Sequence, residues 1–88
     1  MKSQQFKVVD AQGIHARPAS QLVSNSTAFA STIALATDNK EANVKSILSV
    51  MSLALRQGDD FTLRVEGADE EQAFTAISRI LVEMGIAQ

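Results

Sequence analysis

The chain contains no cysteine, so it can form neither a disulfide framework nor a metal site built from thiolates. Packing alone must hold such a fold together, a condition compatible with the cytoplasm. The sequence also lacks any run of about eighteen apolar residues, and its first nine residues include only two cations and no long apolar stretch. These absences indicate neither secretion nor membrane insertion, and we expect a cytoplasmic protein.

Positive charge is also scarce. Eight Lys and Arg residues stand against ten Asp and Glu, for a net charge of -2, and the basic residues are scattered. Because no basic stripe is interleaved with aromatic residues, direct binding of nucleic acid is not expected. The chain has one histidine, His15, and no Asp, Glu or second His lies nearby in the sequence to complete a metal site or a hydrolytic triad. We expect no metal and no cofactor.

The balance of apolar and charged residues is that of a folded domain. The chain has 88 residues, of which 45% are hydrophobic and 20% are charged. This length supports one hydrophobic core but not a second, so residues 1–88 should form a single domain with one functional site. We expect this domain to be a monomer.

Apolar and polar residues alternate in four segments, a period of two that is typical of half-buried strands. The predicted strands cover residues 4–10, 32–35, 41–44 and 61–66. The last is the clearest, because Phe61, Leu63 and Val65 alternate with polar residues between two glycines. Residues 37–40 are polar and predict a turn between the second and third strands.

Three other segments have apolar residues three or four positions apart, which predicts helices. The first should run from residue 16 to 27 or 28, and the second should follow an N-cap at Ser46 and stop near Gly58. The third should be capped by Asp69 and end at Gly85. The predicted inward residues are Ala19, Leu22, Val23 and Ser26 in the first helix and Ala73, Ile77, Ile80, Leu81 and Met84 in the third.

The expected order of elements is therefore β-α-β-β-α-β-α. Such an order suits an α+β fold, an open-faced two-layer β-sandwich in which three helices cover one face of a four-stranded, mostly antiparallel sheet. The other face should lie in water and carry Lys7, Arg64 and Glu66.

The segment around His15 is the most informative for function, because it places this histidine at the mouth of the first helix with Arg17 two residues later. The unpaired amides that follow, those of Ala16 and Arg17, would stabilise an anion attached at His15, and the Arg17 side chain adds a cation. Imidazole is a nucleophile near neutral pH and a good leaving group when phosphorylated. A lone loop histidine is more often simply solvated, but this setting favours a residue that accepts and releases a phosphoryl group.

Ser46 allows two interpretations. Phosphorylation at a helix N-cap would place negative charge beside the positive end of the helix dipole, and such a group could be stable and regulatory. Alternatively, Ser46 only caps the helix, which stabilises it by about 1 kcal/mol. The spacing does not choose between these interpretations.

The helix after Ser46 has more apolar residues than one buried face requires. Its two apolar stripes are Val50, Leu53 and Ala54 on one side and Ile47, Leu48 and Met51 on the other. One stripe is expected to face solvent as a docking surface for protein partners, unless the helix is buried on two sides.

Three segments together resemble the family of histidine-containing phosphocarrier proteins, HPr, of the bacterial sugar phosphotransferase system, and the resemblance covers the whole chain. The segments are GIHARPA at 13–19, VKSI leading to VMSL between 44 and 53, and GADE at 67–70. The resemblance implies a carrier and not a free-standing catalyst. His15 would take a phosphoryl group on Nδ1 from enzyme I, which phosphoenolpyruvate charges, and pass it to the IIA components of sugar permeases, while Arg17 neutralises the group.

The resemblance to the Gram-positive type also implies a regulatory role for Ser46. An ATP-dependent kinase/phosphorylase would modify this serine, and the product would act as corepressor of a catabolite regulator. The docking face for partners would comprise Ile47, Leu48 and Met51, with Ser20 and Val23 beside them.

Four positions depart from the family pattern. Ser49 and Ala54 stand where glycine is common, Ala28 where lysine is common, and Ser20 where threonine is usual. These differences bear on partner preference, and the replacement of glycine is expected to stabilise the second helix slightly.

Two other functions are compatible with these residues. A small hydrolase would bind an acyl phosphate through Arg17 with help from His15, and it would release phosphate without a stable adduct. A purely regulatory binding module would act through Ser46 alone. The presence of both His15 and Arg17 argues against this second alternative.

Overall fold

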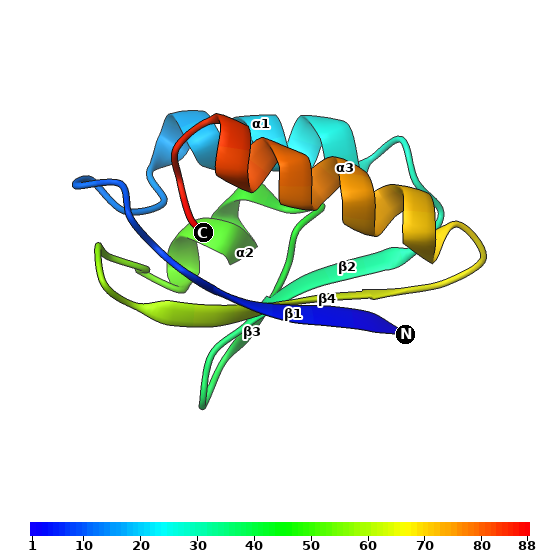
Figure 1. Cartoon of the computed structure of the whole chain (residues 1–88), viewed down its shortest axis with the longest axis horizontal. Helices are drawn as coiled ribbons and strands as arrows, with labels where there is room; N and C mark the ends of the chain where they lie inside the picture. Colours follow the sequence, from blue (N-terminus) through cyan, green and yellow to red (C-terminus); the bar gives the residue numbers. More distant parts are fainter.

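A computed structural model describes all 88 residues and contains four strands and three helices (Figure 1). The elements are β1 (Lys2–Lys7), α1 (Ala16–Ser26), β2 (Thr32–Ala36), β3 (Glu41–Asn43), α2 (Ile47–Ser52), β4 (Asp60–Glu66) and α3 (Glu70–Glu83). This sequence of elements confirms the predicted order. None of the helices has the length and apolar character that a membrane span requires.

The four strands form one antiparallel sheet in the order β1-β4-β2-β3. Phe6 of β1 lies opposite Phe61 of β4, and Leu63 of β4 lies opposite Leu35 of β2. All the helices lie on one face of the sheet, which confirms the predicted open-faced α+β sandwich (Figure 1). The open face carries the exposed polar residues expected there, which are Lys7, Arg64 and Glu66.

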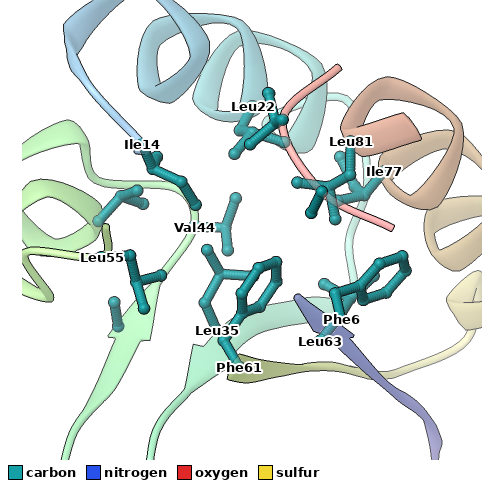
Figure 2. Close-up of a cluster of buried hydrophobic side chains, with 14 of the residues drawn as sticks. Phe6, Ile14, Leu22, Leu35, Val44, Leu55, Phe61, Leu63, Ile77 and Leu81 are labelled. Carbon is teal, nitrogen blue, oxygen red and sulfur yellow. The ribbon is translucent and has the colours of Figure 1, made fainter. Parts of the chain in front are cut away.

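The core fills the space between the sheet and the helices. Every second residue of β4 from Phe61 onward is buried, as the alternation predicts. Leu22 of α1 and Ile77 and Leu81 of α3 meet Phe61 and Leu63 from the opposite side (Figure 2). Burial of each such side chain stabilises the folded state by roughly 1.5–3 kcal/mol. The predicted inward residues that are not fully buried are Val23, Ile80 and Met84.

All four strands have ends that differ from the prediction, by one residue in β2 (to Ala36), β3 and β4 (from Asp60) and by more in β1. β1 begins at Lys2, and its regular ladder with β4 stops at Lys7 instead of continuing to residue 10. Beyond this point the chain also pairs with the C-terminus, since the N–H of Lys7 donates to the carbonyl of Gln88 at 2.8 Å and Val8 bridges to Ala87. β3 ends at Asn43, one residue early. A local pattern could not reveal a contact between opposite ends of the chain.

β2 is covered on both faces, although its sequence predicted one exposed face. Ala34 and Ala36 point away from the core, yet they are only 8% and 6% exposed. Arg64 of β4 lies opposite Ala34, Glu41 of β3 lies opposite Ala36, and the two charged residues form an ion pair of 3.0 Å across β2. The stem of Arg64 therefore covers the strand, and the small alanine side chains leave room for it.

The second helix is shorter than predicted. α2 ends at Ser52, and not near Gly58, because Ala54 adopts a left-handed conformation with a φ of 51°. The N–H of Ala54 donates to the carbonyl of Met51 at 3.0 Å and closes the last turn. Glycine favours this conformation, whereas the Cβ atom of alanine is strained in it. The expectation that Ala54 stabilises the helix is therefore wrong, because this residue lies just beyond the helix.

Asp69 occupies the predicted N-cap of α3, but its side chain does not cap this helix. The carboxylate accepts hydrogen bonds from the N–H groups of Ala30 and Ser31, each at 2.9 Å, and from the hydroxyl of Ser31. Asp69 therefore fastens the loop between α1 and β2 to the start of α3. The neighbouring Glu70 accepts the N–H of Gly67 at 3.2 Å.

Replacing Ala54 by glycine should raise the free energy of unfolding by about 1 kcal/mol, because relief of the strain at positive φ outweighs the larger entropy of the unfolded glycine chain. Urea unfolding measures the change. The matched control, Ala76→Gly inside α3, should lower the free energy of unfolding by a similar amount, about 1 kcal/mol. An Ala54→Gly protein that unfolds at a lower urea concentration than the parent would contradict this account.

The stability of the fold should decline in acid partly through Asp69. Hydrogen bonds from the Ser31 hydroxyl, and next from the Ala30 N–H, hold the pKa of Asp69 below its ordinary value. As the pH falls through the ordinary carboxyl range, the unfolded chain therefore binds more protons than the folded chain does. Stabilisation that is present above that range is lost as the pH drops through the folded-state pKa.

Asp69→Asn should consequently flatten the dependence of the unfolding free energy on pH in this acid window. Part of the slope should persist, because the N–H of Gly67 likewise lowers the pKa of Glu70. Urea titrations at a series of acid pH values provide the measurement. An unchanged slope in Asp69→Asn would show that this carboxylate is not responsible.

Candidate functional site

The backbone of His15 forms the start of α1. His15 is the N-cap residue, with extended backbone (φ -96°, ψ -170°), and its carbonyl accepts the N–H of Ala19 at 3.1 Å. Its side chain makes no capping hydrogen bond and is 36% exposed, so the imidazole is available to an approaching group. The N–H groups of Ala16 and Arg17 lie in the first turn and have no carbonyl partner within the helix.

Gly13 sets the path of the loop before His15. Its φ is 68°, and it lies so close to the carbonyl of Leu55 that a Cβ atom would collide with this oxygen. The next residue, Ile14, is buried and donates its N–H to the same carbonyl at 3.2 Å. The loop that carries His15 is thereby attached to the segment that follows α2.

His15 borders a small cavity of about 260 Å³. The lining residues are Asp10, His15, Arg17, Pro18, Met84 and Ile86. Arg17 is exposed and takes part in none of the five ion pairs of the protein, so its charge is available to an anion. Met84, which was predicted to face the core, is 37% exposed at this cavity. No group of three or more His, Asp and Glu side chains is arranged as metal ligands.

Asp10 is the residue beside the imidazole that the sequence did not identify. Its Oδ2 atom lies 4.0 Å from Nε2 of His15, while Oδ1 accepts the N–H of Gln12 at 2.8 Å. An acidic side chain therefore does lie beside His15, although none was expected near it in the sequence to complete a metal site or a hydrolytic triad. A turn brings the two together, since the carbonyl of Asp10 accepts the N–H of Gly13 at 2.9 Å. Asp followed by Gly three residues later is the pattern that could have indicated this turn.

Ser46 is the N-cap of α2, as predicted. Its Oγ accepts the N–H of Ser49 at 3.3 Å, and the residue is half-buried. The hydroxyl oxygen of Ser49 in turn accepts the N–H of Asn43 at 3.0 Å. The adjacent Lys45 donates to the carbonyl of Phe29 at 2.7 Å. Ser46 therefore caps α2, a role that both interpretations of this serine include.

One apolar stripe of α2 is exposed, as expected for a docking surface. Ile47, Leu48 and Met51, which we call the apolar patch, are 40%, 82% and 41% exposed. Val50 and Leu53 of the other stripe are buried. A helix buried on two sides, the alternative interpretation, does not describe α2.

The other residues expected at the docking face belong to α1, which packs against α2. Ser20 is exposed, and Val23 is half-buried. Ala28, where the family usually has lysine, is exposed just beyond the end of α1.

Comparisons with known proteins agree over the whole chain. A family model described as "PTS HPr component phosphorylation site" matches residues 2–83. Phosphocarrier protein HPr of Lysinibacillus sphaericus is 64% identical over 88 residues, which are 100% of both chains. The solved structure of the histidine-containing phosphocarrier protein of Mycoplasma has a TM-score of 0.95 at 33% identity, with 99% of each chain covered. Another solved structure, the catabolite repression protein Crh of Bacillus subtilis as a swapped dimer, has a TM-score of 0.74 at 35% identity and covers 100% of both chains.

Proposed function

The chain belongs to the HPr family of phosphocarrier proteins of the phosphotransferase system, and we propose that its Nδ1 of His15 accepts a phosphoryl group from phosphorylated enzyme I and passes it to IIA components of sugar permeases. The observation that carries the proposal is the position of His15 at the mouth of α1, partly exposed and in one cavity with the unpaired cation of Arg17.

The transfer step uses only nucleophilic displacement. The Nδ1 lone pair attacks phosphorus, an N–P bond forms, and the donor's bond to phosphorus breaks with its electron pair leaving on the donor. Arg17 and the amides of Ala16 and Arg17 stabilise the negative charge that arrives at His15. Transfer to a IIA component reverses these roles, since neutral imidazole is a good leaving group.

We infer that the protein is a carrier and not a free-standing catalyst. The cavity beside His15 is about 260 Å³, which is below the roughly 300–1,000 Å³ of usual small-ligand sites. Such a site has little capacity to enclose a free substrate or to exclude water from it. A partner protein that covers the cavity would enclose the reacting group and exclude water from it. This favours a carrier over a hydrolase.

The apolar patch is the proposed docking surface for these partners, together with Ser20 and Val23 of α1. Leu48 is 82% exposed, and burying a leucine side chain releases roughly 1.5–3 kcal/mol. Enzyme I, IIA components and the kinase would each recover this energy on binding. Methionine at position 51 suits a surface that several different partners use in turn.

Ser46 is the proposed regulatory site, modified by an ATP-dependent kinase/phosphorylase so that the product acts as corepressor of a catabolite regulator. Its position supports this role, because Ser46 directly precedes the apolar patch. A phosphoryl group there adds about two negative charges beside the surface that partners must bury. The similarity to Crh, whose name refers to catabolite repression, agrees with it. All these partners act in the cytoplasm, where we place the protein.

Phosphoenolpyruvate and enzyme I should add one phosphoryl group to the protein, and His15→Ala should abolish this reaction because the chain has no other histidine. Arg17→Ala should keep the nucleophile but accept the group about a hundredfold more slowly, since it lacks the neutralising cation. Intact-mass spectrometry follows the acid-labile adduct, and Thr75→Ala, at an exposed position of α3 that does not line the His15 cavity, serves as control. Labelling of His15→Ala at the parental level would refute the assignment.

ATP and the kinase/phosphorylase should give an acid-stable adduct on the parent protein and none on Ser46→Ala. Ser52→Ala, which removes a hydroxyl from the other end of α2, should be labelled normally. Because loss of the cap costs about 1 kcal/mol, the folding of Ser46→Ala is checked by circular dichroism. The absence of any adduct on the parent would mean that Ser46 only caps its helix.

A further inference from the structure

We propose that Asp10 is a positioning residue for His15, holding the imidazole by Nε2 so that Nδ1 is the nitrogen left for the phosphoryl group. The inference rests on the proposed function of His15 and adds a residue to it.

The carboxylate of Asp10 is oriented before any partner arrives. Oδ1 accepts the N–H of Gln12 at 2.8 Å, and the Asp10 carbonyl accepts the N–H of Gly13 at 2.9 Å. The turn therefore holds both the side chain and the backbone of Asp10. Oδ2, which these bonds leave unused, is the atom that lies 4.0 Å from Nε2 of His15. The imidazole makes no capping bond to its own helix, and Asp10 is the one acidic residue within 4.0 Å of it.

A separation of 4.0 Å exceeds the length of a direct N–H···O bond. Hydrogen bonds between reacting groups are often long in a free protein and shorten in the complex that reacts. Asp10 and His15 line the same cavity, and a partner that covers it removes the water competing for both groups.

The chemistry follows from the single proton of a neutral imidazole. A carboxylate beside Nε2 favours the tautomer with the proton on Nε2, which leaves the lone pair on Nδ1. When Nδ1 forms its bond to phosphorus, the donor departs with the electron pair of the broken bond and the imidazole ring becomes positively charged. Nε2 keeps its proton throughout. The Asp10 carboxylate stabilises this positive charge, in the way that a buried aspartate supports histidine in a catalytic triad.

The negative charge of Asp10 repels the incoming phosphoryl group less strongly than a carboxylate beside Nδ1 would. Asp10 lies on the Nε2 side of the ring, whereas the phosphoryl group adds at Nδ1, so the imidazole separates the two charges. Arg17 lines the same cavity and has no acidic partner of its own, and its cation offsets the carboxylate.

Nitrogen-15 NMR of the imidazole tests this inference, because the chain has only one histidine and every imidazole signal therefore belongs to His15. In alkaline solution, where the ring is neutral, the parent protein should show Nε2 protonated and Nδ1 bare. Asp10→Asn keeps an oxygen for the N–H of Gln12 but removes the charge, and it should shift the population towards the Nδ1–H tautomer. Asp38→Asn, which makes the same charge change in the β2–β3 turn, should leave the tautomers unchanged.

In rapid-mixing experiments with phosphorylated enzyme I, Asp10→Asn should accept the phosphoryl group about tenfold more slowly than Asp38→Asn. A parent protein with mainly Nδ1–H, equal tautomer populations in Asp10→Asn and the parent, or equal acceptance rates in the two variants would each overturn the role of Asp10. The tautomer measurement needs no partner, and it also stands if Asp10→Asn folds poorly, because the parent spectrum alone can refute the proposal. A parent that accepts no phosphoryl group would instead refute the proposed function.

Discussion

The close contact between Gly13 and the carbonyl of Leu55 sets the position of His15 relative to the rest of the fold. Only a residue without Cβ can approach this carbonyl with a φ of 68°, and Ile14 adds a hydrogen bond to the same oxygen. Leu55 directly follows Ala54, whose left-handed conformation ends α2. The start of α1 and the end of α2 are therefore held together by this contact, although they belong to different parts of the chain.

This contact also links the two parts of the proposed function, phosphoryl transfer at His15 and docking at the apolar patch. The first turn of α1 supplies unpaired amides and the cation of Arg17, and α2, attached to the same loop through Leu55, carries the apolar patch. The fold therefore connects the proposed docking surface and the proposed acceptor site through one loop. Such an arrangement suits the proposed function, in which successive partners exchange a phosphoryl group with His15.

Several features of the fold and the site could be predicted from the residues because they depend on neighbours in the sequence. The alternation along β4, the inward face of α1 through Leu22 and the Ser46 cap are all set within a few positions, and the structure confirms each. Asp69 shows the limit of such reasoning. It has the right residue type and position for a cap, yet its carboxylate bonds to Ala30 and Ser31, which lie far away in the sequence.

By itself the sequence determined the order of elements, the position of His15 at a helix mouth and the surplus apolar stripe of α2, because period, helix dipole and capping are local properties. The tertiary structure decided the strand order, the pairing of Lys7 with Gln88 and the approach of Asp10 to His15. These depend on which distant segments share a surface and on which conformation a turn adopts. Packing settles such choices only when the whole core has formed.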